Sequence, residues 1–335
     1  MSKKFEHHQS AHCENGVASN LLAFNGLYLS EPMIFGIGSG ILFFYMPLLR
    51  VYHAPGFSFR PTPGAIFNRV ANKLGIKIKR QKFKNPQKAQ EALDQNLAKN
   101  IPTGLQIGVY NLSYFPDEYR FHFNAHNIVV FGKEGDRYLI SDPVMLQTTS
   151  LSVAELEKVR FSKGILAPHG HMYYPTYVPK NIDLEKAIIK GIKLTCFTML
   201  APLSFVGVKA IRRVAKNIVI WHKKKGAKIT NHYLAQLVRM QEEIGTGGGG
   251  FRYVYAAFLQ EASDILKNKE LFEMSKEMTA IGDLWRDFAV EIARVYKNRS
   301  NTSNVYQVLS DKMMHIYERE NAFFRKLKRV IKKNG

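Results

Sequence analysis

The stretch AHNIVVFGKEGDRYLISDP, residues 125–143, decides the fold of the first half of the chain. Two apolar runs, 127–131 and 138–141, flank the turn-forming sequence GKEGD, so the stretch predicts an antiparallel β-hairpin. His126 opens the first predicted strand and Asp142 closes the second. Because antiparallel pairing brings these two ends together, we expect Asp142 to accept a hydrogen bond from the ring of His126.

Cys13 lies directly before a predicted helix, residues 15–24, which Asn25-Gly26 ends. The positive end of a helix dipole favours thiolate over thiol, and its free N–H groups can hold a developing oxyanion. A nucleophilic cysteine also needs a base, and the base needs an orienting partner. The order Cys13, His126, Asp142 is the papain-like order, so we predict these three as catalytic residues. The spacing alone leaves open that none of them has a chemical role.

Helix and strand signals alternate in the first half of the chain. Thr62-Pro63 and Asn85-Pro86 are start signals for two helices, residues 103–110 predict a strand, and Ser152 with Glu155 forms a capping box. Pro168, Pro175 and Pro179 indicate a linker. The patterns after it are helical, over residues 184–194, 206–221, 233–244, 251–266, 271–296 and 305–331. The prediction is therefore an α+β domain over 1–178 and an all-α domain over 179–335.

Charge is the unusual feature of the composition. The net charge is +21 in 335 residues, and 29 basic against 15 acidic residues after position 178 account for most of it. Such a surface attracts acidic partners, but charge alone does not choose among nucleic acid, anionic membrane, coenzyme A and an acidic carrier protein. No motif of a named nucleic-acid module is present, so we expect no nucleic acid.

Cysteine content and apolar segments indicate the compartment. Two cysteines, Cys13 and Cys196, are too few for a disulfide-stapled secreted domain, and the N-terminal residues lack the apolar run of a signal peptide. The uncharged segments 32–49 and 194–208 contain prolines or are short, so we expect them to be buried rather than membrane-spanning. The expected location is the cytoplasm. The basic amphipathic run 325–333 could make peripheral contact with an anionic membrane, or it could equally be a helix with its charges in water.

The N-terminal segment, residues 5–45, reads FEHHQSAHCENGVASNLLAFNGLYLSEPMIFGIGSGILFFY. It resembles the start of the BtrH N-terminal domain family, named for an acyltransferase of butirosin biosynthesis. The matching elements are His12-Cys13, Asn20-Leu21-Leu22, Gly26, Ser30-Glu31, Gly36-Ile37-Gly38-Ser39-Gly40 and Phe44-Tyr45. Residues 125–143 resemble the His-strand-turn-strand-Asp block of that family and are similar to bacteriocin-leader peptidases of the papain-like superfamily. The resemblance covers roughly residues 5–165.

The resemblance implies a papain-like cysteine-peptidase-type fold and an acyl transfer from a phosphopantetheinyl carrier protein to an amine. On this chain, Cys13 would attack the thioester, His126 would shuttle the proton and Asp142 would orient His126. Gln9 would supply an oxyanion donor, although its spacing is not that of the peptidases. Glu31 would make buried hydrogen bonds or bind the acceptor. No bound cofactor is implied, because the phosphopantetheine thioester or coenzyme A is a co-substrate.

The helical half resembles the domain of unnamed function that often follows this family's N-terminal domain, through residues 207–221 and 244–262. The glycine run 245–250 fits G-x-G-x-x-G, but it follows no strand, which argues against a dinucleotide site. It is either a flexible joint or a phosphate or acceptor site, with Gly248, Gly249 and Arg252 as substrate-binding residues. Basic residues at 212, 213, 216 and 223–225 suggest a docking face for the carrier. Residues His7, His8 and His12 have no second ligand pair at zinc spacing, so no metal is expected.

Three functions follow from the sequence. The first is an acyltransferase with a carrier or coenzyme A thioester as donor and a small amine, in a secondary metabolite or a lipid, as acceptor. The second is a papain-like cysteine peptidase or amidase with the same triad. The third is a non-catalytic basic binding protein. The oligomeric state is not indicated.

Overall fold

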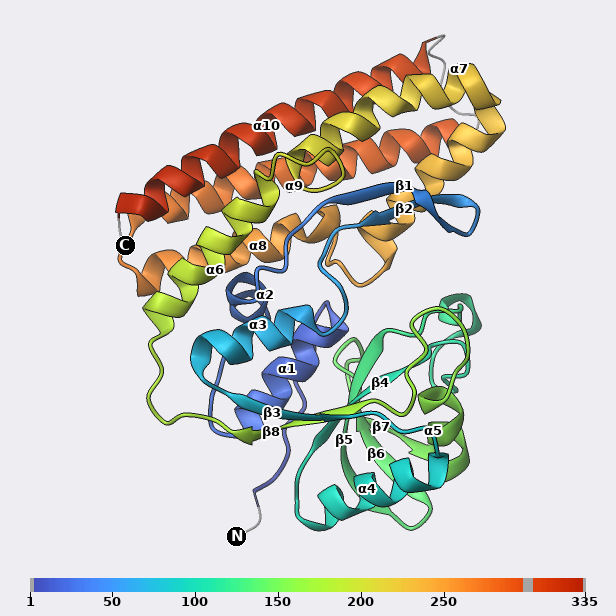
Figure 1. Ribbon diagram of the computed structural model, residues 1–335, viewed down its shortest axis with the longest axis vertical. Helices are drawn as coiled ribbons and strands as arrows, with labels where there is room; N and C mark the ends of the chain where they lie inside the picture. The colour runs from blue at the N-terminus through green and yellow to red at the C-terminus, as the bar shows by residue number, and fades with distance from the viewer. Residues whose placement is uncertain (1–2, 298–303, 334–335) are drawn as a thin grey trace. The chain divides into compact units, whose positions relative to one another are not determined.

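The computed structural model describes residues 3–297 and 304–333 and divides the chain into two units. Unit 1 contains Met1–Ile34 and Pro63–Asp183, and unit 2 contains Phe35–Thr62 and Leu184–Gly335. The architecture is α+β, with the sheet in the N-terminal unit and a helical C-terminal region (Figure 1). The break after Asp183 lies close to the predicted break after residue 178. The transfer of Phe35–Thr62 to unit 2 was not predicted.

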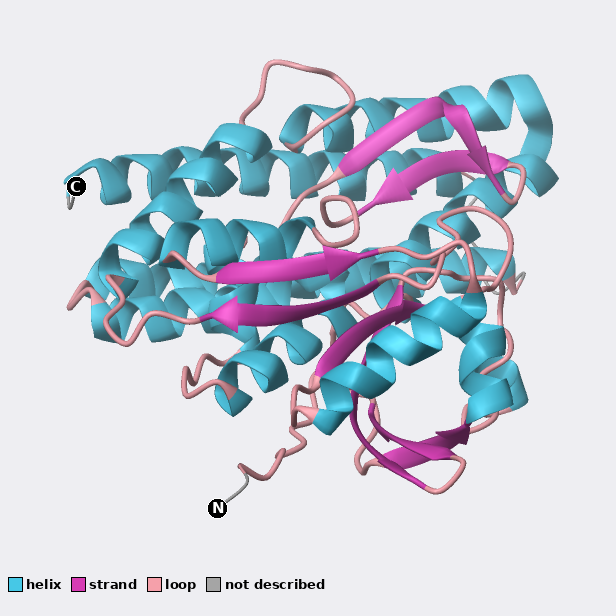
Figure 2. Ribbon diagram, turned by 60° about the horizontal axis from the view of Figure 1, so that its bottom comes forward, coloured by secondary structure: helices cyan, strands magenta, loops and turns pink. Residues whose placement is uncertain are grey.

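A twisted, six-stranded antiparallel sheet forms the centre of unit 1 (Figure 2). Its strand order is β3-β8-β4-β5-β6-β7. The strands are β3 (Lys77–Gln81), β4 (Thr103–Ile107), β5 (His126–Glu134), β6 (Arg137–Ser141), β7 (Thr149–Ser152) and β8 (Met172–Tyr177). The helices of this unit are α1 (Cys13–Phe24), α3 (Ala65–Leu74), α4 (Pro86–Ala98) and α5 (Val153–Arg160), and α2 (Glu31–Ile37) begins in it.

The alternation of side chains along β5 separates two environments. Ile128 and Val130 are buried in a core cluster with Leu93 of α4 and Leu156 of α5. Neighbouring residues on a strand point to opposite faces, so Asn127 lies on the other face. Helix α1 packs against β5, and its first residue meets Asn127. This arrangement places the start of α1 at the point where β5 begins.

Unit 2 is built mainly from long helices. They are α6 (Leu184–Met199), α7 (Val208–Val238), α8 (Arg252–Ile265), α9 (Lys269–Tyr296) and α10 (Val305–Lys333). Helix α7 is longer than predicted because it continues through Gly226, which has a non-helical backbone (φ 77°, ψ 173°) and kinks the helix. A glycine tolerates this conformation because it has no Cβ.

A two-stranded hairpin, β1 (Phe44–Val51) and β2 (Ala54–Ser58), also belongs to unit 2, although the described elements after residue 178 are helical as predicted. Its start pairs with the segment before α7, through an isolated bridge between Phe44 and Val206. Phe43 and Phe59, which flank the hairpin, pack with Trp285 of α9 at ring-centroid distances of 5.6 and 5.2 Å. Because these rings are buried among the helices, Phe35–Thr62 belongs to unit 2 and not to unit 1.

The structure also differs from the prediction at the expected linker. Pro175 lies in β8, which occupies an interior position of the sheet. Pro175 pairs with β3 but lies beyond the part of β8 that pairs with β4, which is limited to Tyr173 and Met172. On the β4 side, residue 175 is therefore at an edge, and its missing N–H costs no ladder bond there. The prolines predicted a linker where the chain forms strand β8.

The uncharged segments 32–49 and 194–208 are buried only in part, because Leu48, Leu49 and the residues 202–205 are exposed. None of the helices in the described part of the chain is long and apolar enough to cross a membrane. In the basic run near the C-terminus, the side chains of Leu327, Val330 and Ile331 are buried within unit 2. Because these residues would have to insert into lipid, the C-terminal part of α10 does not offer the predicted amphipathic membrane face.

Candidate functional site

Cys13 is the first residue of α1 and is buried, with 7% of its surface exposed. His12 before it has an extended backbone (φ −120°, ψ 125°), so the helix begins at the cysteine itself. The thiol therefore lies in the first turn, where backbone N–H groups have no partner within the helix. This is the helix-start position that the sequence predicts, two residues earlier than the expected helix.

His126 and Asp142 are in direct contact. His126 Nε2 lies 2.7 Å from Asp142 Oδ2. The two residues extend from paired strands, since Val129 of β5 lies opposite Ser141 of β6. The proximity predicted from the hairpin is therefore found, and Asp142 is completely buried.

The carboxylate of Asp142 has two further donors. The hydroxyl of Tyr114 donates to Oδ2 at 2.9 Å, and the backbone N–H of Val144 donates to Oδ1 at 3.2 Å. Burial raises the pKa of Tyr114 well above its usual value, and the negative charge of Asp142 adds to this effect. Tyr114 therefore keeps its proton and remains a donor. These bonds compensate for the burial of a carboxylate and fix its orientation.

The charge state of His126 depends on Cys13 as well as on Asp142. Burial favours the neutral ring, but the charges of Asp142 and of the Cys13 thiolate, with hydrogen bonds to both groups, raise the pKa of His126 from 6.5 to about 10. Because Nε2 bonds to Asp142, the ring nitrogen that faces Cys13 is Nδ1. The ring of Phe115 packs edge-on against the imidazole at 5.6 Å. The site can therefore hold a thiolate–imidazolium pair.

Asn127 is a site residue that the sequence analysis missed. Its Nδ2 donates to Cys13 Sγ at 3.8 Å and to the carbonyl of Ala125 at 3.1 Å. Its Oδ1 accepts a hydrogen bond of 2.7 Å from the hydroxyl of Tyr173. The amide is thus held with its NH₂ group toward sulfur, where it can stabilise negative charge. In the sequence, the features that could have identified Asn127 are its position next to His126 and the tyrosines of β8.

Tyr173 is itself held firmly. Burial raises its pKa well above the usual value, so the hydroxyl stays protonated and donates to Asn127. The guanidinium of Arg80, from β3, lies over its ring at 4.9 Å from the centroid. A cation over an aromatic face is attracted to it. The contacts therefore run from β3 through β8 and β5 to the sulfur.

Glu31 holds the chain just before Cys13. Its carboxylate accepts from the N–H groups of Ala11 at 2.8 Å and His12 at 2.7 Å. Burial raises the pKa of Glu31, and the hydrogen bonds from Ala11, His12 and Asn15 oppose that rise. Of the two roles expected for Glu31, this geometry supports the hydrogen-bonding role.

Gln9 has an exposed side chain in the extended segment before α1. The structure brings Asn127, rather than Gln9, to the sulfur. The same segment is fixed to the Asp142 loop, because Ser10 N–H donates to the carbonyl of Pro143. The role of Gln9 as an oxyanion donor stays a prediction.

Two features of α1 set its position. The side chain of Glu14 accepts from the N–H groups of Gly64, Ile66 and Phe67 at 3.0–3.3 Å and so caps the start of α3. Gly16 packs so closely against Pro143 that a Cβ at this position would overlap with the proline ring. A small residue is therefore required where α1 passes the loop that carries Asp142.

The predicted substrate site at the glycine run is not supported by its contacts. The N–H of Gly248 donates to Thr246 Oγ1, and the N–H of Gly249 donates to the carboxylate of Glu242. These amides are therefore not free to bind a phosphate. Arg252 is completely buried and forms a bidentate pair with Glu320 at 2.9 and 3.0 Å. Its role is structural, because its charge is neutralised inside unit 2.

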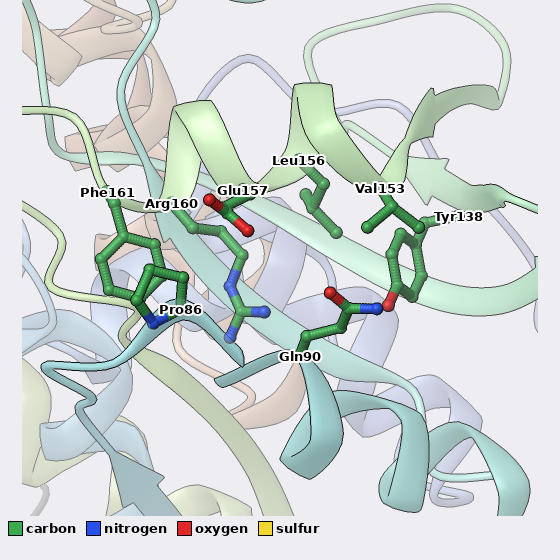
Figure 3. Close-up of a pocket in the computed structure, with 8 residues that line it drawn as sticks. All are labelled: Pro86, Gln90, Tyr138, Val153, Leu156, Glu157, Arg160 and Phe161. Atoms are coloured by element: carbon green, nitrogen blue, oxygen red, sulfur yellow. The ribbon is translucent and has the colours of Figure 1, made fainter. Parts of the chain in front are cut away.

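A hollow between α4 and α5 is a separate feature of unit 1 (Figure 3). Arg160 points into it, and burial lowers the pKa of this guanidinium to about 10. The cavity volume is only about 10 Å³, which is little more than one water molecule. Arg160 donates to the carbonyl of Ala89, so its visible role is to join the two helices.

Comparison with protein families gives two adjoining matches. Residues 154–327, just over half of the chain, match a domain of unknown function, DUF4872. Residues 12–143 match the family described as butirosin biosynthesis protein H, N-terminal. The chain therefore belongs to the DUF4872 family, and its N-terminal part is similar to the butirosin biosynthesis family. The N-terminal match begins one residue before Cys13 and ends one residue after Asp142, so it contains the three predicted catalytic residues.

Both matches confirm the resemblance seen in the sequence. The N-terminal match relates the chain to a biosynthetic, acyltransferase-like family. No curated protein matches the chain significantly.

Proposed function

We propose that this protein is an acyltransferase that moves an acyl group from a thioester to an amine through an acyl-Cys13 intermediate. The observation that carries the proposal is the contact series from Asp142 through His126 to Cys13. A buried cysteine at a helix start, beside a histidine held by a carboxylate, has the arrangement of an activated nucleophile. The match to the butirosin-biosynthesis family favours acyl transfer as the reaction.

We propose the papain-like fold for the first unit on the same grounds. Its cysteine begins a helix packed on an antiparallel sheet, and its histidine and aspartate lie at the ends of neighbouring strands. This combination of order and geometry is shared by papain-like sites. The cysteine, histidine and aspartate would then form the predicted triad.

In the first step, the Cys13 thiolate attacks the thioester carbonyl and a tetrahedral intermediate forms. The bond from carbon to the leaving sulfur breaks, and the His126 imidazolium gives its proton to the departing thiolate. In the second step, the acceptor amine attacks acyl-Cys13 and neutral His126 takes the amine proton. Collapse of the second intermediate releases the amide and restores the thiolate–imidazolium pair.

Asn127 is the proposed side-chain donor to the charge that develops in each step. Its NH₂ group is oriented by Tyr173 and already lies beside sulfur. Donors fixed in advance in a dry site stabilise a developing oxyanion without having to reorganise. The backbone N–H of Cys13, at the helix start, is the second proposed donor.

The thioester donor would be an acidic carrier protein with a phosphopantetheine arm, or coenzyme A. Both are anionic, which suits the net charge of +21. Of the predicted docking residues, Lys223, Lys224 and Lys225 lie exposed beside the kink of α7. Arg212 and Lys216 are also exposed, but they are not part of this consecutive cluster, and the guanidinium groups of Arg212 and Arg213 lie over the rings of Tyr317 and Tyr45. We therefore place recognition of the donor at the three lysines.

The test is a transfer assay with acyl-N-acetylcysteamine, which mimics the end of the phosphopantetheine arm, and a panel of primary amines. The proposal predicts an amide product and release of free thiol, both lost in Cys13→Ala. Thiol release without amide formation would assign a hydrolase. Cleavage of peptides with no use of thioesters would assign the peptidase alternative, and a complete lack of reaction with either would contradict the proposal.

A further inference from the structure

Exposed apolar residues gather on the β1–β2 hairpin of unit 2 and on the segment that lies beside its first strand. Leu48 is 92% exposed, Leu49 is 51% exposed, and Tyr52 is 49% exposed. Leu203 and Phe205, from the segment between α6 and α7, are 48% and 38% exposed. We call these five residues the hairpin strip. Large exposed apolar residues that gather on a protein surface typically indicate an interaction site.

A hydrogen bond and a ring contact show that the two segments that carry the strip are neighbours. The N–H of Tyr45 in β1 donates to the carbonyl of Phe205 at 3.0 Å. The rings of Phe44 and Phe205 meet edge-on at 6.0 Å. The segment before α7 therefore lies against the start of β1, and Figure 1 shows the hairpin extending from there toward its turn.

A bulge exposes the two leucines. Pairing between β1 and β2 is regular up to Met46 opposite Gly56 and resumes at Arg50 opposite Pro55. Three residues of β1, Pro47 to Leu49, thus have no paired counterpart in β2. A bulge redirects side chains away from the regular strand direction. Leu48 consequently projects into solvent, where an aliphatic side chain is unfavourable unless a partner covers it.

The turn of the hairpin also departs from the usual sequence. Tyr52 and His53 form the two-residue turn with φ values of 50° and 65°. Asn-Gly is the common pair at such a turn because bulky side chains are strained at positive φ. An aromatic residue at this place costs stability and puts a half-exposed phenol at the end of the strip. Strained residues that persist on a surface are often functional.

Positive charges border the strip. The guanidinium of Arg50 donates to the hydroxyl of Tyr233, Lys209 Nζ donates to the carbonyl of Pro202, and Arg213 donates to Ser204 Oγ. Each acceptor is neutral, so these contacts hold the cations beside the strip without cancelling their charge.

Arg239 extends this border to the turn. Its guanidinium lies over the ring of Tyr52 at 5.6 Å and is paired with Glu243 at 3.8 Å. Helix α7 adds further charge nearby. His232 Nε2 meets the carbonyl of Tyr52 at 2.7 Å, and Lys228 lies one helical turn before His232.

From this arrangement we infer that the hairpin strip is a docking surface for an anionic lipid membrane. Leu48 and Leu49 insert among the acyl chains, Tyr52 lies at the interface, and the bordering Arg and Lys side chains bind lipid phosphates. Aliphatic and aromatic residues bordered by cations are the typical composition of interfacial membrane anchors. A projecting leucine surrounded by charge fits insertion into a bilayer better than it fits a flat acidic protein surface. The inference is independent of the reaction proposed for Cys13.

The experiment is co-sedimentation of the full chain with two kinds of vesicle, pure phosphatidylcholine and equal parts of phosphatidylcholine and phosphatidylserine. The inference predicts binding to the anionic vesicles and a loss of about tenfold or more for Leu48→Ser/Leu49→Ser. Ile165→Ser/Leu166→Ser is the matched control, because it removes two consecutive exposed aliphatic side chains from unit 1. It should bind like the unaltered chain.

A second pair of variants separates this site from general attraction by a basic protein. Arg50→Glu/Lys209→Glu should weaken binding to anionic vesicles more than Lys88→Glu/Lys99→Glu, which makes the same charge change on α4. Circular dichroism and thermal unfolding establish that each variant is folded. Equal losses in the matched variants would overturn the inference, as would equal binding to both kinds of vesicle or no binding to either.

Discussion

His126 Nε2 and Asp142 Oδ2 lie 2.7 Å apart, inside a protein environment that excludes water from the carboxylate. This contact leaves the opposite nitrogen of the ring for Cys13 and determines which tautomer the neutral imidazole adopts. A carboxylate in this position also stabilises the imidazolium. The proposed chemistry depends on this pair more than on any other contact of unit 1.

The first prediction concerns Asp142→Asn. The amide keeps nearly the same volume but loses the negative charge, so the imidazolium is less stable and the ring is held less well. We expect acylation of Cys13 to slow by about 10²-fold or more. Single-turnover kinetics with acyl-N-acetylcysteamine measure this rate. Tyr114→Phe, which removes one donor to the same carboxylate, should have a smaller effect, and equal rates in Asp142→Asn and the unaltered chain would exclude the assigned role.

The second prediction is the titration of His126. Its pKa is raised from 6.5 to about 10, so the ring should remain protonated across the neutral range. Ring chemical shifts followed by NMR as a function of pH measure this titration. The folded pKa exceeds the unfolded one. The stability contributed by this proton is therefore complete below pH 6.5 and is lost as the pH rises through about 10.

Asp142→Asn provides the control for this titration. Without the carboxylate charge, the pKa of His126 should fall, and the chemical-shift transition should move to lower pH. A ring that titrates near its usual value in the unaltered protein would show that the thiolate–imidazolium pair does not form.

The third prediction separates Asn127 from Tyr173. Asn127→Ala removes the donor beside sulfur and should lower kcat by about 10²- to 10³-fold. Tyr173→Phe keeps the amide but removes its orienting hydroxyl, so we expect a loss of about two- to tenfold. The measurement is kcat and KM for thioester consumption. An effect on KM alone would indicate that Asn127 binds the substrate and does not stabilise the transition state.

The fourth prediction tests the structural role of Arg252. Glu320→Gln leaves a buried guanidinium without its counter-charge and should cost about 3–5 kcal/mol of unfolding free energy. Arg252→Met/Glu320→Leu removes both charges and should cost less than the sum of Arg252→Met and Glu320→Leu made singly. Denaturant unfolding measures all four variants. If Arg252→Met weakened substrate binding in a fully stable protein, the original assignment of Arg252 as a substrate-binding residue would stand.

Local signals in the sequence predicted much of unit 1. The Ser152 capping box and the Asn85 cap are both present, and the hairpin that carries His126 and Asp142 forms where its apolar runs and turn place it. These features depend on residues close together in the chain. The contact of His126 with Asp142 could be predicted for the same reason.

Features that depend on distant partners could not be predicted. Strand β3, with the sequence KIKRQ, carries alternating charges and is a strand only because β8 pairs with it. The approach of Asn127 to Cys13 requires α1 to cross β5, which no local pattern specifies. Arg252 looked available for a ligand because its partner, Glu320, lies 68 residues away in the sequence.

The most direct test of the central claim is the intact mass of the protein after brief exposure to acyl-N-acetylcysteamine without an amine. Burial raises the pKa of the Cys196 thiol to about 12, so this second cysteine should not react. The account predicts one acyl adduct, located on Cys13 by peptide mapping, retained in Cys196→Ala and discharged when an amine is added. No adduct, or an adduct that persists in Cys13→Ala, would contradict it.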